Sequence, residues 1–274
     1  MKNKPFRIVT YAFAIVWALA TIIPLITTLL SSFKSNTDIF GGSLLLPTQW
    51  LFSNYSDAIL DAGILNSVMN SMILGLGTTG GVLIVALLAG YILARQKFFF
   101  IKPVYVFFLF GLLLPVHATI IPISKIAASL KAIDNFPFII LVYIAFQLPQ
   151  AIFLITGYIG GISRELDEAA IIDGCSLPST LFRIIAPVST PILSTVAILS
   201  FIYGYSELVF SVILLNDKTK FPVSRALMFF TGERVTRMGP VFASIIIAVL
   251  PMMILYIFFH EKVQKGMIAG CVKG

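Results

Sequence analysis

The chain has 274 residues, of which 58% are hydrophobic and 11% are charged, and its mean hydropathy is +1.00. A soluble domain has about half apolar and a quarter charged residues, so this composition excludes an ordinary soluble protein. The net charge of +7 comes without a basic cluster or an aromatic platform, so we predict no nucleic-acid binding. Basic residues that flank membrane helices explain the charge more simply.

Six stretches without a charged residue follow one another along the chain, and each has at least 22 residues. About 20 residues suffice for a helix to cross a bilayer, and in hydrocarbon such a helix satisfies its own backbone hydrogen bonds. We therefore predict an all-α polytopic membrane protein whose single transmembrane domain comprises residues 1–274. The predicted spans are 8–30, 67–94, 103–124, 137–160, 187–207 and 239–260.

The first predicted span, 8–30, follows three basic residues and resembles the start of a secretory signal peptide. Its apolar run continues about ten residues past a cleavage-like ALA at 18–20, which is longer than the apolar region of a signal peptide. We therefore expect an uncleaved membrane helix. Segment 39–56 is also free of charge, but its glycines and Pro47 would interrupt a helix, so we place it in a loop outside the membrane.

The orientation follows from the basic residues outside the spans. Six spans place both termini on one side, and a cytoplasmic placement puts eleven Lys and Arg inside and eight outside. The excess is small, but it is clear around the early helices, which usually set the orientation. We predict cytoplasmic termini, with Cys175 and Cys271 as small structural residues on the side where disulfides are rare.

The predicted inner loop 161–186 concentrates negative charge. Four of the twelve acidic residues of the chain lie within nine positions, namely Glu165, Asp167, Glu168 and Asp173. Ser163 is the predicted N-cap of a short helix, because carboxylates in the first turns complement the helix dipole. Gly174 is the predicted residue after the helix, where it permits a sharp exit.

A second short helix is predicted after the glycine, with Ser176 as its cap and Pro178 in its first turn. Pro187 and Pro191 predict a bent entry into the fifth span. The second helix has an apolar face, which consists of Leu177, Leu181, Ile184, Ile185 and Val188.

The first short helix has a face of mostly small residues, formed by Leu166, Ala169, Ala170 and Asp173. Such a face allows another surface to approach closely, as in helix-in-groove recognition. An ordinary solvated loop explains the composition equally well.

Residues 168–191, EAAIIDGCSLPSTLFRIIAPVSTP, resemble the EAA loop of ABC importer permeases. The segments 113–123, 143–159 and 265–274 are similar to the carbohydrate-uptake branch, and specifically to the second permease subunit of maltose-type importers. At 203–207 the chain reads Tyr-Gly-Tyr-Ser-Glu where many relatives carry Trp-Asn-Asp, which weakens any transfer of substrate identity. The matching positions of the loop are Glu168, Ala169, Ala170, Asp173, Gly174, Phe182, Ile185, Pro187 and Pro191.

The resemblance implies a type I ABC importer permease fold with a cytoplasmic coupling helix, in a multi-pass protein of the bacterial cytoplasmic membrane. The implied partners are a second, distinct permease subunit, two ABC ATPase subunits, an extracellular solute-binding protein and a sugar. The chain has no G-x-x-x-x-G-K-[ST] motif, so we expect no cofactor on it and place ATP and Mg²⁺ on the ATPase subunits. The implied ATPase-coupling residues are Glu168, Ala169, Ala170, Asp173, Gly174 and Phe182.

Polar residues inside the predicted spans are candidates for the substrate pathway. The candidates are Asn70, Gln147, Tyr205 and Glu207. Asn70 and Gln147 are of a type that often joins helices by hydrogen bonds, and tyrosine is common at membrane interfaces. A membrane-embedded glutamate indicates function, although Glu207 bounds its window and an outer-interface position is an alternative. We expect His117 to pack at a kink near Pro115.

The predicted function is ATP-driven import of a di- or oligosaccharide by alternating access. A non-sugar solute such as glycerol 3-phosphate is the alternative, but its phosphate favours cations and the six uncharged stretches contain no Lys or Arg. An ion-coupled secondary transporter is less consistent with the sequence, because such proteins usually carry several buried carboxylates. We predict no catalytic or metal-binding residue, since His117 and His260 lie in different spans without an acidic pair.

Overall fold

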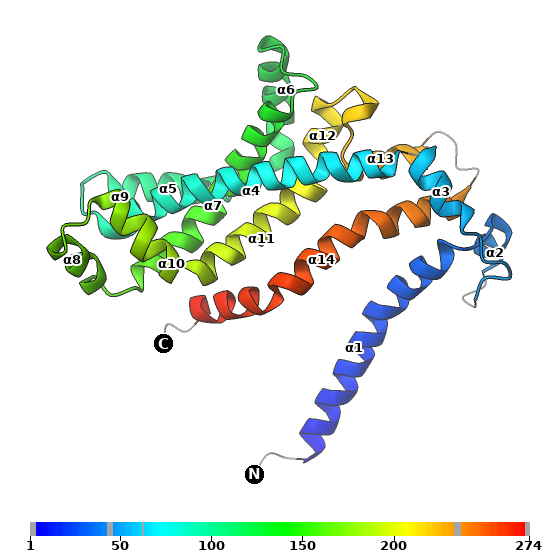
Figure 1. Cartoon of the computed structure of the whole chain (residues 1–274), viewed down its shortest axis with the longest axis horizontal. Helices are drawn as coiled ribbons and strands as arrows, with labels where there is room; N and C mark the ends of the chain where they lie inside the picture. Colours follow the sequence, from blue (N-terminus) through cyan, green and yellow to red (C-terminus); the bar gives the residue numbers. More distant parts are fainter. Residues whose placement is uncertain (1–3, 43–45, 62, 233–236, 272–274) are drawn as a thin grey trace. The chain divides into compact units, whose positions relative to one another are not determined.

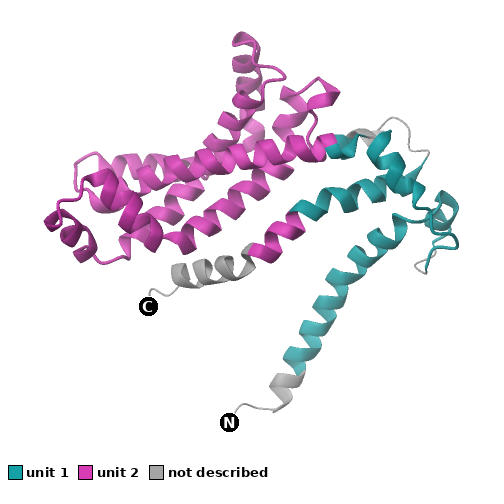
Figure 2. Ribbon diagram, viewed as in Figure 1, with its two compact units in different colours: residues 1–65, 226–251 teal, residues 66–225, 252–274 magenta. Residues whose placement is uncertain are grey.

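The computed structural model describes the backbone of residues 4–42, 46–61, 63–232 and 237–271 (Figure 1). Within these ranges it also describes the side chains, except those of 4–8, 229–232 and 259–271. The described chain is helical and forms two compact units, coloured separately in Figure 2. Unit 1 comprises residues 1–65 and 226–251, and unit 2 comprises 66–225 and 252–274.

Unit 1 contains α1 (Lys4–Ser31), α2 (Asn36–Phe40), α3 (Ser53–Leu60), most of α13 (Val223–Gly232) and the first part of α14 (Met238–Cys271). The buried amide of Asn54 donates to the carbonyl oxygens of Ser32 (3.0 Å) and Lys34 (3.1 Å), and so connects α3 to the chain after α1. The predicted loop 39–56 contains only short helical pieces, too short to cross a bilayer.

The long helices of unit 2 are α4 (Ile64–Arg95), α7 (Phe136–Gly160) and α11 (Thr190–Ser206), and Figure 1 shows them running along one another. Glycines bring them close. A Cβ atom built on Gly204 of α11 would lie 3.0 Å from the Cα of Gly75 on α4. Small residues at helix contacts are typical of membrane proteins, where close van der Waals packing replaces the hydrophobic effect as the source of association.

The core of unit 2 extends from these long helices into the predicted inner loop. There the chain forms α8 (Glu165–Ile172), α9 (Leu177–Thr180), the π-helical turn η2 (Leu181–Ile185) and α10 (Ala186–Val188). The loop is therefore attached to the helical bundle through its second half. The buried core residues are Val82, Ala86, Leu87, Tyr91, Ala151, Ile152, Ile155, Ile159, Leu181, Ile185 and Val196.

Four helical segments are long and apolar enough to cross a membrane, namely Val9–Ser31, Ile64–Arg95, Phe136–Gly160 and Met238–Phe258. Two further helix pairs pass the same test only together, and each is sharply bent. The described chain thus has four candidate spans, or six if each bent pair crosses once.

The first bent pair joins α5 (Ile101–Gly111) to η1 (Val116–Thr119) and α6 (Ile120–Ser129) at 96°. The break ends at Pro115, which has no backbone N–H for a helical hydrogen bond. The predicted span 103–124 thus contains a sharp break, and the kink expected near Pro115 is present. His117 does lie at the break, within η1, but it is exposed rather than packed.

The second bent pair joins residues 177–188 to α11 at 82°, beside Pro187 and Pro191. The predicted bent entry into the fifth span is confirmed. At the other end of unit 2, α12 (Val209–Leu214) and η3 (Lys218–Lys220) follow α11, and α12 contacts α6 and α7.

Candidate functional site

The predicted short helix with the acidic residues is present as α8, and local signals define both of its ends. The Ser163 hydroxyl accepts the backbone N–H of Glu165 at 3.2 Å, but the N-cap position belongs to Arg164, one residue later than predicted, and its side chain makes no capping hydrogen bond. Gly174 has a φ of +75°, and the N–H groups of Gly174 and Cys175 donate to the carbonyl oxygens of Ile171 and Ala170. This is a Schellman ending, in which the left-handed residue is usually glycine.

The second half of the loop confirms part of the predicted apolar face. Leu181 and Ile185 are buried in the core, whereas Leu177 and Val188 are exposed. The π-helical turn over 181–185 accounts for Val188, because a wider turn rotates the following side chains away from the phase of an α-helix. Leu177 precedes this turn, at the start of α9. Ser176 occupies the predicted cap position of α9, but its side chain makes no capping hydrogen bond.

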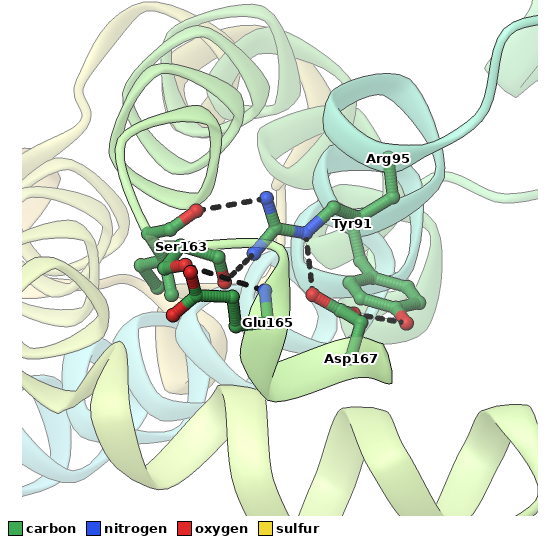
Figure 3. Close-up of polar contacts among 6 residues, drawn as sticks. Tyr91, Arg95, Ser163, Glu165 and Asp167 are labelled. Atoms are coloured by element: carbon green, nitrogen blue, oxygen red, sulfur yellow. Dashed lines mark hydrogen bonds and ion pairs between the residues drawn. The ribbon is translucent and has the colours of Figure 1, made fainter. Parts of the chain in front are cut away.

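A cluster of buried polar groups fastens α8 to the end of α4 (Figure 3). Arg95 Nε lies 2.9 Å from Asp167 Oδ2, and the two side chains are only 6% and 15% exposed. The hydroxyl of Tyr91 donates to the other carboxylate oxygen of Asp167 at 2.8 Å. The Arg95 guanidinium also donates to the carbonyl oxygens of Ile162 (3.0 Å) and Ser163 (3.4 Å).

Sequence reasoning missed this cluster. It interpreted Arg95 as one of the basic residues that flank membrane helices and Asp167 as a carboxylate that complements the helix dipole. The contact itself could not be predicted, because Tyr91 and Asp167 are 76 positions apart. A cavity of about 240 Å³ adjoins the cluster. Its lining is formed by Tyr91, Arg95, Gln96, Arg164, Asp167, Glu168, Ile171, Cys175, Leu177 and Thr180.

The rest of α8 points away from the chain. Ala170 is buried, but Glu168, Ala169, Asp173 and Gly174 are exposed. Two apolar side chains that sequence reasoning did not single out are among the most exposed, Ile171 at 69% and Ile172 at 85%. Phe182 is also exposed. The helix thus presents an apolar end flanked by carboxylates, outside the packing of its own chain.

Two candidates for the substrate pathway make structural hydrogen bonds. The amide of Asn70 donates to the carbonyl oxygens of Thr219 (2.8 Å) and Phe221 (3.1 Å), and so holds the segment after α12 against α4. Glu207 is buried at the end of α11, where its carboxylate accepts the backbone N–H groups of Phe210 and Ser211 at the start of α12.

The other two candidates also lie in unit 2. Gln147 is half-buried on α7, and Tyr205 is buried on α11 with its ring stacked on Phe201. An apolar cavity of about 450 Å³ between α4, α11 and α14 is lined by residues such as Leu76, Phe201 and Met253. Its lining includes none of the four candidates, so they do not converge on this cavity.

No group of three or more His, Cys, Asp or Glu side chains in the described part of the chain is arranged to hold a metal ion. Cys175 is a free, half-buried thiol. The side chain of Cys271 lies outside the described residues. The polar cluster at Arg95 consists of a guanidinium, a carboxylate and a phenol hydroxyl, and its contacts join α8 to α4.

Comparison with known proteins gives a consistent assignment. The model of the family "Binding-protein-dependent transport system inner membrane component" matches residues 85–269. The diacetylchitobiose uptake system permease protein NgcG of Streptomyces coelicolor is 28% identical, over 98% of this chain and 89% of its own length. The melibiose/raffinose/stachyose import permease protein MelC of Bacillus subtilis is 29% identical, over 100% of this chain and 99% of its own length.

A solved structure supports the fold. It is that of a bacterial ABC transporter involved in the import of the acidic polysaccharide alginate. One of its chains is 23% identical, with a TM-score of 0.82 over 95% of this chain and 98% of that one. The chain therefore belongs to the binding-protein-dependent transport system inner membrane component family, as a multi-pass, non-enzymatic permease subunit of an ABC importer whose nucleotide is bound by the ATPase partner.

Proposed function

We propose that this permease imports a di- or oligosaccharide by alternating access, and that α8 is its coupling helix. The observation that carries the proposal is the exposed end of α8, where Ile171 and Ile172 lie outside the packing of the chain. An apolar helix end with small and acidic neighbours fits a groove on a partner protein. In an ABC importer the partner that supplies energy is the ATPase. We therefore propose that α8 docks in a groove of the ATPase subunit.

The proposed coupling residues have distinct roles. Ala169 permits close docking, and Glu168 and Asp173 offer exposed carboxylates to basic groups of the ATPase. Gly174 turns the chain back towards the membrane, and Phe182 adds an exposed aromatic side chain to the same loop. Ala170 contributes from inside, because its small buried side chain lets α8 lie close to the rest of unit 2.

The proposed complex contains two permeases, two ATPases and an extracellular solute-binding protein. The second permease is a distinct chain, and ATP and Mg²⁺ bind to the ATPases. Docking of α8 on the ATPases places α8 and both termini in the cytoplasm. Labelling intact cells with a membrane-impermeant maleimide tests this orientation in a variant with no native cysteine and one cysteine at Phe99, which is exposed and lies outside the proposed docking surface. We expect labelling only after permeabilisation, and labelling of intact cells would refute the orientation.

Several observations support a sugar as the solute. Relatives that cover nearly the whole chain are named for the import of diacetylchitobiose and of melibiose, raffinose and stachyose. No Lys or Arg lies in the six uncharged stretches, which is unfavourable for a phosphorylated solute. We propose that Gln147 and Tyr205 line the pathway. Asn70 and Glu207 contribute indirectly, by holding the segments that follow α12 and α11 in place.

The solute is tested by reconstituting the complete transporter with its binding protein in proteoliposomes. The test panel comprises melibiose, raffinose, stachyose, diacetylchitobiose and glycerol 3-phosphate. We expect ATP-dependent accumulation of a neutral sugar. Accumulation of glycerol 3-phosphate alone would refute the sugar assignment, and uptake by the isolated permease down an ion gradient would refute ATP-driven import.

A further inference from the structure

The Arg95 side chain joins three elements of unit 2 at one point. It is the last residue of α4, it forms an ion pair with Asp167 on α8, and it donates to carbonyl oxygens at 162 and 163, just after α7. Tyr91, one turn earlier on α4, donates to the same carboxylate. Both ends of the Asp167 carboxylate are thereby fixed by α4 (Figure 3).

Other attachments of α8 to the chain are weak. Of its apolar side chains only Ala170 is buried, so apolar packing contributes little to holding the helix. Its two backbone connections contain glycine, at Gly161 before the helix and at the left-handed Gly174 after it. Glycine is the least restricted residue, so these connections alone would let α8 turn relative to the bundle.

Stability alone does not explain a buried ion pair. The cost of removing two charges from water often exceeds their attraction, whereas loss of one partner leaves an unpaired charge and is strongly unfavourable. The best-attested benefit of such a pair is a defined geometry, here through a single contact between Arg95 Nε and Asp167 Oδ2. The Arg95–Asp167 pair fixes how α8 is oriented on α4.

The far end of α4 is also fastened by polar contacts. Asn70 holds the carbonyl oxygens of Thr219 and Phe221, and the Ser71 hydroxyl contacts the Tyr205 carbonyl oxygen and the Val223 N–H at 3.0 Å each. Between these points α4 is a continuous helix without proline. A displacement of α8 therefore has a continuous helical connection to the opposite end of unit 2.

From these contacts we infer that Tyr91, Arg95 and Asp167 form a rigid link through which movement of α8 is transmitted to α4. The inference rests on the proposed role of α8 as the coupling helix. Arg95 and Tyr91 are positioning residues: they act on transport through α8 and α4 and touch neither solute nor nucleotide. Weakening the link separates ATP hydrolysis from solute movement.

The first test measures solute taken up per ATP hydrolysed by the complete transporter in proteoliposomes. We expect Asp167→Asn and Arg95→Lys to retain the ATPases and to hydrolyse ATP, while uptake per ATP falls by about tenfold, a typical size for coupling between sites. Tyr91→Phe removes one hydrogen bond and should give a smaller decrease. The matched controls are Glu165→Gln, in the same first turn of α8, and Arg164→Lys, beside the same cavity.

A charge exchange separates a positioning role from a folding role. The double variant Asp167→Arg with Arg95→Asp restores opposite charges across the contact, so we expect it to recover part of the uptake per ATP that either single change loses. Unchanged uptake per ATP in Asp167→Asn would overturn the inference. A second result would also overturn the inference: every variant fails to assemble with the ATPases, and the fraction that does assemble takes up a normal amount of solute per ATP.

The second test requires no transport and so separates failure of the link from failure of the proposed function. Spin labels at Ile172 on α8 and at Ile92 on α4, both exposed, report the distance between the two helices in a cysteine-free background. We expect a narrow distance distribution with the native cluster and a broad one in Asp167→Asn. Distance distributions of equal width in the native protein and in Asp167→Asn would overturn the inference. Absence of ATP-driven uptake by the wild type would instead overturn the proposed function.

Discussion

The carboxylate of Glu207 accepts the backbone N–H of Phe210, with both oxygens 3.1 Å from the nitrogen. Glu207 therefore caps α12 directly after α11 ends, in a buried position. A carboxylate at this place satisfies N–H groups that have no partner inside the helix and complements its dipole. The sequence predicted either a cavity or an interface position for Glu207, and neither alternative included this capping role.

The cap predicts how substitutions of Glu207 act. Glu207→Ala removes the acceptor and should destabilise the protein by about 1–2 kcal/mol, as loss of other helix caps does. Glu207→Gln keeps an acceptor oxygen and should lose less. Thermal unfolding of the purified permease in detergent measures both, with exposed Glu165→Ala as the control. Equal melting temperatures for wild type and Glu207→Ala, with impaired uptake, would show that Glu207 serves transport rather than α12.

A second prediction concerns Gly174, whose φ of +75° is unfavourable for any residue with a side chain. A Cβ atom there would meet no neighbour, so Gly174→Ala adds backbone strain of about 1–2 kcal/mol without a clash. We expect α8 to end differently and ATPase co-purification to fall. Gly157→Ala, which also adds a Cβ in open space but on the regular helix α7, is the control. Normal co-purification in both variants would exclude a role for the turn in docking.

The contact between α4 and α11 predicts a third effect. A Cβ atom at Gly204 would lie 3.0 Å from the Gly75 Cα and 3.1 Å from the Leu74 carbonyl oxygen, and backbone atoms cannot move aside alone. Gly204→Ala should therefore separate the helices and cost about 1–3 kcal/mol, as overpacking does elsewhere. Gly80→Ala on α4 meets no atom within 4 Å and should be harmless. Thermal unfolding compares the two, and equal stability would contradict the described crossing.

Asn70 predicts a fourth effect, on the segment that follows α12. Asn70→Ala leaves the carbonyl oxygens of Thr219 and Phe221 without this donor, so protection of residues 219–223 from hydrogen exchange should decrease. Asn66→Ala removes one exposed bond to Thr219 and should have a smaller effect. If Asn70→Ala abolishes uptake while exchange stays unchanged, Asn70 contacts the solute instead of holding this segment.

Local sequence signals predicted α8 and its ends well. Ser163, the acids of the first turn and Gly174 act within a few residues of one another, so their effect does not depend on the rest of the fold. Proline was similarly informative at the entry to α11, beside Pro191. A kink near Pro115 was expected as well, but not that it would break the helix, because proline also occurs inside the continuous helices α1, α7 and α14.

Long-range pairing could not be predicted from the same signals. Nothing near Arg95 specifies Asp167 rather than Glu165 or Glu168 as its partner, because the choice depends on how α8 is rotated against α4. The same rotation decides that Ala170 is buried while its neighbour Ala169 is exposed. The π-helical turn at 181–185 likewise arises from packing and has no distinct sequence signal.

The contacts of Arg95 with Asp167 and with the carbonyl oxygens of Ile162 and Ser163 also affect how α4 can interact with lipid. Arg95 is the single charged residue of α4, and a cation at the end of a membrane helix ordinarily anchors that helix in the headgroups. Here the guanidinium is engaged by Asp167 and two backbone carbonyls and is nearly inaccessible. Arg95 is therefore not available to anchor the helix that carries the link in the headgroups.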